Sequence, residues 1–219
     1  MMQKMSTKKM TTLAMLSVMA YVVTFLARSF PPMVLFLRYD PKDIIITIGG
    51  FLFGPLAAFL ITLVVSTVEM FTVGQSGPVG LMMNVISGSA FACTASFIYK
   101  HNRTMKGAMI GLVSGVLLMT TLMVLWNYLI TPLFLGIPRE QVVSMLVPTI
   151  MPFNIIKGGL NAAFTILLYK PIRTALAAAN MMPRQEEAVA GKINLGVMMI
   201  AGFVVISCVL WVMAINGRI

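Results

Sequence analysis

Three polar side chains share one face of an apolar segment in the second half of the chain. Asn154, Lys157 and Asn161 are spaced by three and four residues within the expected helix Pro152–Tyr169, and this spacing places them on one side of a helix. A lysine inside a membrane span either extends its ammonium group to the headgroups or faces a partner or an aqueous cavity. The asparagines on both sides of Lys157 favour the cavity.

Two further asparagines lie at a similar depth in other expected helices. Asn84 lies in Val79–Tyr99, and Asn127 lies between Trp126 and Tyr128 in Gly107–Ile130. For any one asparagine, hydrogen bonding between helices is an equally good explanation. The convergence of all these amides and one amine at one level favours a binding site. Amides donate and accept hydrogen bonds, so aromatic and methionine walls around them would suit a flat heterocycle with carbonyls and ring nitrogens at its edge.

The sequence contains no recognisable catalytic set, and we do not expect an enzyme. It has no Ser/His/Asp arrangement and no G-x-x-x-x-G-K-[ST] loop for binding phosphate. His101 lies in a polar loop, whereas Cys93 and Cys208 lie in apolar stretches, where cysteine behaves as a small buried hydrophobe. Neither a metal nor a cofactor is expected. Glu69, near a helix end, is either an exposed acid or a rim residue, and the first is favoured.

The composition indicates an integral membrane protein. Of the 219 residues, 59% are hydrophobic and only 10% are charged, whereas about a quarter of a typical soluble domain is charged. The net charge of +10 would suggest a nucleic-acid partner in a soluble protein. Here the basic residues lie between apolar runs and mark cytoplasmic loops instead. The basic segment 1–12 is also compatible with a signal peptide, but we interpret it as leading into the first span.

The stretch Asp43–Thr72 decides the topology. As one helix it would be about 45 Å long, too long for an untilted span, whereas a break at Gly54-Pro55 gives a hairpin of two short helices. Only the hairpin puts ten basic residues on the cytoplasmic side, as expected for a membrane protein. Those residues are Lys4, Lys8, Lys9, Lys100, Arg103, Lys106, Lys170, Arg173, Arg184 and Lys192.

The resulting fold prediction is an all-α integral membrane bundle of six helices, with short helices 2 and 3 and an extra C-terminal transmembrane helix. Its N-terminus is cytoplasmic. The chain divides into a transmembrane bundle (1–173), a cytoplasmic linker (174–192) and the extra helix (193–219). The remaining spans expected are Met10–Ala27 and Ile193–Ile215.

Small residues form a stripe on the first expected helix. Ser17, Ala20, Thr24 and Ala27 follow helical spacing, and Ala14 is nearby. Small side chains let another helix approach closely. That helix could belong to the same chain or to a partner subunit, and the pattern alone does not separate the two.

Several motifs resemble a known family. They are Leu37-Arg38-Tyr39-Asp40, Gly49-Gly50-Phe51-Leu52-Phe53-Gly54-Pro55, Trp126-Asn127-Tyr128 and Pro152-Phe153-Asn154-Ile155-Ile156-Lys157-Gly158. Over about residues 8–173 the chain resembles the substrate-binding S components of energy-coupling factor (ECF) vitamin transporters, and among them the riboflavin-specific members.

The resemblance implies that a vitamin binds near the outer face, beneath the loop after the first helix. Carried over by motif, Asn127, Asn154 and Lys157 would contact the flavin ring, with Tyr128 beside them. The loop residues Leu37, Arg38, Tyr39 and Asp40 would help to close the site, although Arg38-Tyr39 replaces the more usual Lys-Phe. No family motif includes Asn84. We add it to the expected site because of its depth in the membrane and the helix face on which it lies.

The resemblance also implies partners, namely a membrane T component and two ATP-binding subunits. In the family the first helix often carries Ala-x-x-x-Ala for docking onto the T component. Here Val18 follows Ala14 at that spacing, so Ser17 and Ala20 are the nearest substitutes. The seventh helix has no counterpart in the six-helix pattern.

Two alternatives stay open at this point. One is an S component for another vitamin or for FMN, because Arg38 and Lys42 lie near the expected mouth of the site. The other is a small membrane scaffold or sensor that transports nothing.

Overall fold

The computed structural model describes residues 7–29 and 37–181, together with scattered helical residues between 196 and 213. The described part is an all-α bundle, as predicted. Its elements are α1 (Thr7–Arg28), α2 (Lys42–Phe53), α3 (Pro55–Thr72), α4 (Gly77–His101), α5 (Met105–Leu129), α6 (Thr131–Leu135), α7 (Arg139–Met145), the π-helical turn η1 (Leu146–Ile150) and α8 (Met151–Ala178).

The predicted hairpin at Gly54-Pro55 is confirmed. Gly54 has a φ of 93°, a conformation that glycine adopts without the steric cost met by other residues. Pro55 occupies the first position of α3, where its missing N–H would have no partner in the helix. The chain therefore reverses between α2 and α3 within a single residue.

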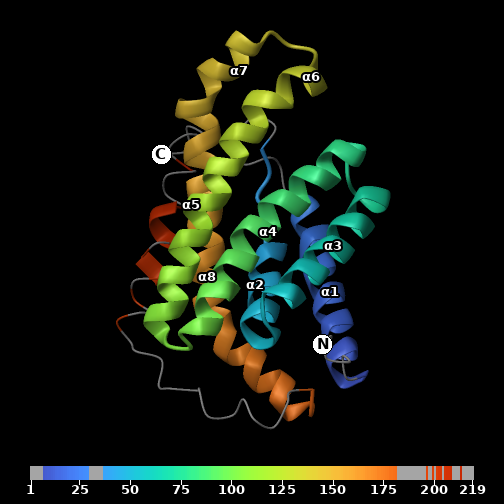
Figure 1. The fold of residues 1–219 in the computed structure, drawn as a ribbon, viewed down its shortest axis with the longest axis vertical. Coiled ribbons are helices and arrows are strands. Elements are labelled where there is room, and N and C mark those ends of the chain that lie inside the picture. Colours follow the sequence, from blue (N-terminus) through green and yellow to red (C-terminus); the bar gives the residue numbers. More distant parts are fainter. Residues whose placement is uncertain are drawn as a thin grey trace.

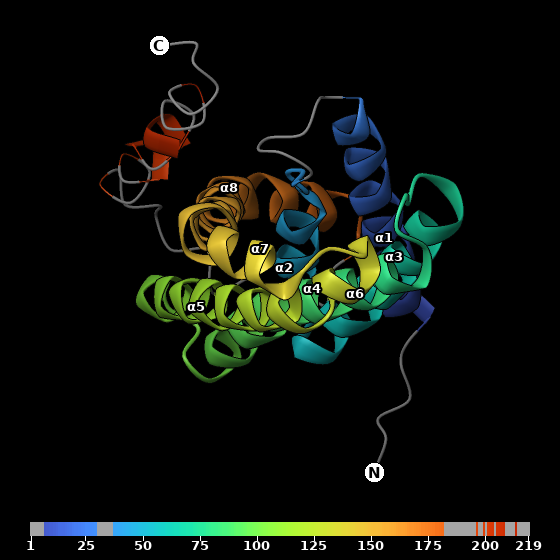
Figure 2. The ribbon, with the colours of Figure 1, turned by 90° about the horizontal axis from the view of Figure 1, so that it is seen from above.

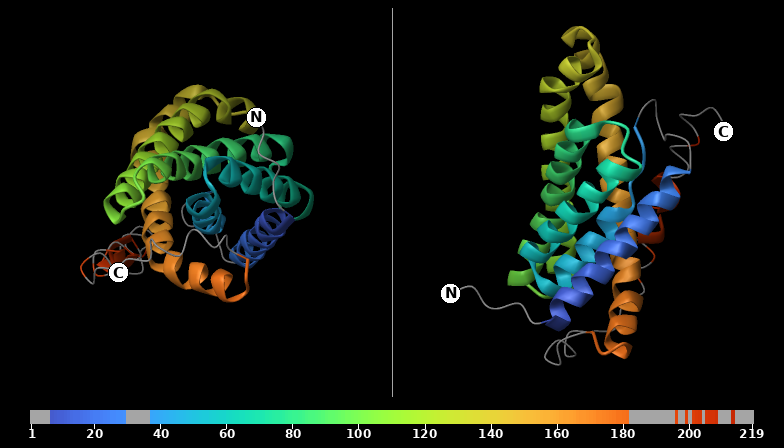
Figure 3. Two further views of the ribbon diagram at one scale, coloured as in Figure 1. Left: turned by 60° about the horizontal axis from the view of Figure 1, so that its bottom comes forward. Right: turned by 90° about the vertical axis from the view of Figure 1, so that its right-hand side faces the viewer.

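Helix α2 lies at the centre of the bundle. Eleven of its twelve residues are buried, and it packs against α1, α3, α4 and α8; the left view of Figure 3 shows it enclosed by the other helices. A helix that is apolar on all sides is expected in such a place. Gly50 allows the close contact with α4, because a Cβ atom there would lie 2.0 Å from the Ser96 Oγ atom.

The remaining long helices can cross a membrane. Within the described residues, α1, α3, α4, α5 and the continuous stretch Arg139–Ala178 are long and apolar enough to do so. Helices α4 and α5 pack closely because Gly111 and Gly115 of α5 face the α4 backbone. Cβ atoms at these glycines would lie 2.7 Å from the Ala95 carbonyl oxygen and 2.6 Å from that of Phe91, the kind of approach that small residues permit between membrane helices.

The two ends of the bundle differ in character. Figure 1 shows α6 and α7 at one end and the first residues of α1 toward the other. Seen from above in Figure 2, α6 lies beside α4, and α7 lies between α8 and α2. At the far end, Phe51, Tyr99 and Tyr169 form an aromatic cluster, with ring centroids of Phe51 and Tyr99 4.4 Å apart.

The expected C-terminal end of one helix was wrong. Helix α8 does not end at Tyr169 but continues past Pro171 to Ala178; Figure 3 shows its last part turning across the lower end of the bundle. The connection 131–151 contains α6, α7 and η1. The linker after 181 and most of the helix expected at Ile193–Ile215 lie outside the described residues, so the division of the chain at 173 and 192 stays a prediction.

Candidate ligand-binding site

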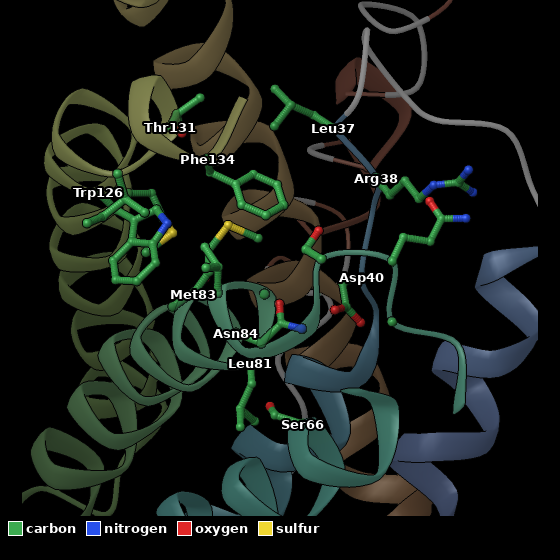
Figure 4. A pocket seen from close by; sticks show the side chains of 18 of the residues that line it. Leu37, Arg38, Asp40, Ser66, Leu81, Met83, Asn84, Trp126, Thr131 and Phe134 are labelled. Carbon is green, nitrogen blue, oxygen red and sulfur yellow. The ribbon is translucent and has the colours of Figure 1, made fainter. Parts of the chain in front are cut away.

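A cavity of about 320 Å³ opens at the end of the bundle that carries α6 and α7. Its volume falls at the lower end of the range of about 300–1,000 Å³ typical of small-molecule sites. The C-terminal ends of α1, α3 and α5, the N-terminal ends of α4 and α8, the loop before α2, and α6 contribute to its lining. Figure 4 shows Trp126 and Phe134 around it, with Asn84 and Ser66 lower in the view.

Most of the predicted site residues line this cavity. Asn84, Asn127, Asn154 and Lys157, which we expected at one level of three different helices, all contribute to it. Leu37, Arg38 and Asp40 of the loop before α2 line it as well. The tertiary structure thus brings together seven of the nine residues proposed from the sequence.

Tyr39 and Tyr128 are the two exceptions. The Tyr39 hydroxyl is within 2.8 Å of Asn161 Oδ1 and donates to it, so this side chain fastens the loop to α8 instead of lining the cavity. Tyr128 is 37% exposed, and the Arg139 guanidinium lies 5.2 Å from its ring centroid. Since Asn127 faces inward, the next residue is rotated by about 100° around the helix and faces elsewhere.

The two asparagines of α5 and α8 are held by their own helices. The amide nitrogens of Asn127 and Asn154 donate to the carbonyl oxygens of Met123 (2.7 Å) and Ile150 (2.8 Å). Thr131 donates to the Asn127 amide oxygen at 2.9 Å. These bonds restrict both amides to defined orientations at the cavity wall.

Glu69 is the centre of a buried ion-pair network at the wall of the cavity. One of its carboxylate oxygens pairs with Arg28 at the end of α1, and the other pairs with Lys42 at the start of α2. Asn84 of α4 donates to the second oxygen at 3.2 Å. Lys42 also pairs with Asp40. Four chain segments are therefore joined through one carboxylate.

Lys157 belongs to a second ion pair, with Asp43 in the first turn of α2. Its ammonium nitrogen lies 3.5 Å from Asp43 Oδ2, an oxygen that also accepts from Asn161 at 3.4 Å. Lys157 is only 8% exposed. Lys157 thus lines the cavity and pairs with Asp43 inside the bundle instead of extending to the headgroups in this conformation. Its contact with a ligand stays a prediction.

Sequence reasoning missed these networks and was wrong about Glu69. Glu69 is 1% exposed and not a solvated acid, because Arg28 and Lys42 neutralise it within the bundle. A signal was available, since Asp43 and Glu69 interrupt an apolar stretch, and ionisable residues inside membrane segments need partners. Three of the six acidic residues of the chain, Asp40, Asp43 and Glu69, take part.

Two residues in the loop before α2, Tyr39 and Asp40, have shifted pKa values. Burial by itself would raise the pKa of Asp40, but the nearby cations Lys42, Lys157 and Arg28 outweigh it and lower this pKa to about 2. Burial, followed by the carboxylates Asp43 and Asp40, raises the pKa of the Tyr39 phenol above its usual range. Asp40 is therefore an anion, and Tyr39 a neutral donor, at physiological pH.

The proposed docking stripe on α1 is divided by the fold. Ser17 (7% exposed) and Ala20 (0%) are buried within this chain. These two residues therefore pack against helices of the same chain, which was one of the two expectations for the stripe. Neither can contact a partner in this arrangement. Ala14 is exposed, together with Val18 and Val22, so any docking surface on α1 lies on that side of the helix.

Comparison with known proteins identifies the family. Residues 8–169 match the family described as "ECF transporter, substrate-specific component". The chain is 32% identical to "Riboflavin transporter RibU" of Staphylococcus aureus (strain TCH60) over 176 residues, covering 77% of this chain and 92% of that protein. It is 30% identical to "Riboflavin transporter FmnP" of Bacillus subtilis (strain 168), again over 176 residues, covering 76% and 93%.

A solved structure agrees with this assignment. The S component of a bacterial ECF transporter superimposes with a TM-score of 0.66 at 32% sequence identity, covering 77% of this chain and 97% of that one. The fold of this chain thus matches that of a known S component.

Proposed function

Because the chain belongs to the family of ECF transporter substrate-specific components, we propose that it captures riboflavin in the cavity at the α6–α7 end of the bundle. The observation that carries the proposal is the convergence of Asn84, Asn127, Asn154 and Lys157 on one cavity. Their amides and amine supply the donors and acceptors that the edge of a flavin ring needs. Relatives named riboflavin transporters share 30–32% identity with this chain.

Charge favours riboflavin over its phosphate ester, FMN. Arg28 and Lys42 are paired with Glu69, Lys42 also with Asp40, and Lys157 with Asp43. Arg38, which also lines the cavity, donates to the Arg28 carbonyl oxygen at 3.4 Å. A phosphate would have to compete for these cations while facing Asp40 and Glu69, which line the cavity. Like charges brought together in a poorly solvated site disfavour binding. A neutral ligand avoids that cost.

Orientation and partners complete the proposal. With the ten basic residues in the cytoplasm, the N-terminus is inside and the cavity opens to the outer face. A membrane T component and two ATP-binding subunits would then supply the energy for transport, since this sequence has no phosphate-binding loop. In this arrangement residues 1–173 form the transporter bundle, followed by a cytoplasmic linker and an additional membrane helix.

Titration of the purified protein tests the ligand. We expect flavin absorbance in the purified sample and riboflavin affinity below about micromolar, with weaker binding of FMN. Tight binding of a different vitamin, with no riboflavin binding, would reject the flavin assignment while keeping the family. Equal affinity for FMN would reject the argument from charge.

A scaffold or sensor without transport makes a different prediction. In that case Asn154→Ala and Lys157→Met would leave riboflavin uptake by cells unchanged. We expect both variants to reduce uptake.

Labelling of single cysteines tests the orientation. In a chain whose native cysteines are replaced by alanine, Gln141→Cys on α7 should react with an impermeant maleimide added to intact cells. Arg103→Cys, between α4 and α5, should react only after the cells are opened. The reverse pattern would invert the topology.

A further inference from the structure

One wall of the cavity is formed by polar residues of α3 and α4. Ser66 and Glu69 are three residues apart on α3, and Asn84 and Ser87 are three residues apart on α4, so each pair shares a helix face. All four line the cavity. Figure 4 places Ser66 and Asn84 on one side of it and Trp126 on another.

The two serine hydroxyls are buried without a partner. Ser66 is 0% exposed and Ser87 is 4% exposed, and neither Oγ atom has a hydrogen-bond partner in the part of the chain that the structure describes. Two other buried hydroxyls of these helices do have partners. Thr62 and Ser96 donate to the carbonyl four residues earlier, at 2.8 and 2.6 Å.

Asn84 offers an acceptor at the same wall. Its amide nitrogen donates to Glu69 Oε2 at 3.2 Å, and the ion pairs of Glu69 with Arg28 and Lys42 hold that carboxylate in place. The nitrogen of the amide is thereby directed toward Glu69. The amide oxygen of Asn84 remains to accept a hydrogen bond from a ligand.

We infer that Ser66, Ser87 and Asn84 form a subsite for a hydroxyl-bearing chain of the ligand. This inference rests on the proposed function and deepens it: the ring would lie against the wall of Trp126 and Phe153, and the polyol chain against α3 and α4. A buried polar group without a partner costs free energy. A ligand hydroxyl both donates and accepts, so a polyol satisfies both serines and Asn84 together.

Two flavins that differ only in the chain test this subsite. Riboflavin carries a ribityl chain on the ring, whereas lumiflavin carries a methyl group in its place. Ser66→Ala and Ser87→Ala should each lower riboflavin affinity by about 3- to 10-fold, the effect of losing one neutral hydrogen bond, and change lumiflavin affinity by less than about 2-fold. Affinities come from quenching of flavin fluorescence in detergent.

Ser89→Ala is the matched control. Ser89 is on the same helix, and its hydroxyl also has no partner among the described residues, but it does not line the cavity. We expect it to leave the affinity for both flavins unchanged. Thermal unfolding without ligand shows that each variant is folded.

The outcomes separate this inference from the proposed function. Equal losses for riboflavin and lumiflavin, no loss for either, or similar affinities of the unaltered protein for the two flavins would overturn the subsite while keeping the flavin site. Binding of neither flavin by the unaltered protein would overturn both proposals.

Discussion

The two ends of the bundle use buried side chains in opposite ways. At the cavity end, Glu69, Lys42 and Asp40 form ion pairs around a space of about 320 Å³. At the other end, Phe51 and Tyr99 pack ring against ring, and no cavity residue lies among them. Buried ion pairs contribute little net stability, because desolvation offsets their attraction, whereas apolar packing contributes directly. The comparison indicates that apolar packing at one end stabilises the bundle, whereas the charged end surrounds the cavity that we propose as the ligand site.

Phe51→Ala should have the largest effect, and on stability alone. Removing a buried phenylalanine ring typically costs about 3–5 kcal/mol of unfolding free energy, and Phe51 is 7% exposed. We expect a lower midpoint of thermal unfolding with unchanged riboflavin affinity in the folded fraction. Phe97→Ala, at an exposed position near the same end, is the control and should change neither. A loss of affinity in Phe51→Ala would contradict the separation of the two ends.

Lys157→Met should weaken binding most strongly. A hydrogen bond from a charged group contributes about 1.5–3 kcal/mol, so riboflavin affinity should fall by about 10- to 100-fold. Some stability should be lost too, because Asp43 loses its cation. Lys170→Met makes the same change at an exposed position on the same helix, and it should bind riboflavin normally. Isothermal titration of both variants with riboflavin measures the two affinities. Equal affinities would contradict a role of Lys157 in binding.

Glu69→Gln should have an intermediate effect that acts through Asn84. Glutamine keeps the size of the side chain but removes the charge that orients the Asn84 amide. We expect riboflavin affinity to fall by about 5-fold, the effect of about 1 kcal/mol. The loss should be non-additive with Asn84→Ala in a double-mutant cycle. Glu140→Gln, an exposed acid on α7, is the control. Additive losses would show that Glu69 does not act through Asn84.

Tyr128→Phe should have the smallest effect. Tyr128 does not line the cavity, and its ring contact with Arg139 does not depend on the hydroxyl group. Affinity should stay within about 2-fold of the unaltered protein, below the effect of a typical hydrogen bond. A loss of riboflavin affinity as large as that expected for Lys157→Met would instead support the contact between Tyr128 and the ligand that was predicted from the Trp-Asn-Tyr motif.

Much of the fold could be predicted because it depends on local chemistry. The low content of charged residues predicted a membrane protein, and Gly54-Pro55 predicted the break between α2 and α3. Helical spacing predicted that Asn154 and Lys157 lie on one face. These properties follow from composition, backbone conformation and periodicity, which residues close in sequence determine. The helix end at Pro171 was misplaced because a proline can bend a helix that packing holds together.

The membrane bundle, its hairpin and the polar helix faces could thus be predicted from local properties of the chain. What each polar face contacts depends on tertiary packing. Glu69 pairs with Arg28, 41 residues away, and Tyr39 with Asn161, 122 residues away, while Ser17 and Ala20 pack inside the chain. Periodicity shows which side of a helix a residue is on, but its partner depends on how distant helices pack. For this reason Glu69, expected to be a surface acid, is the centre of a buried ion-pair network at the wall of the cavity.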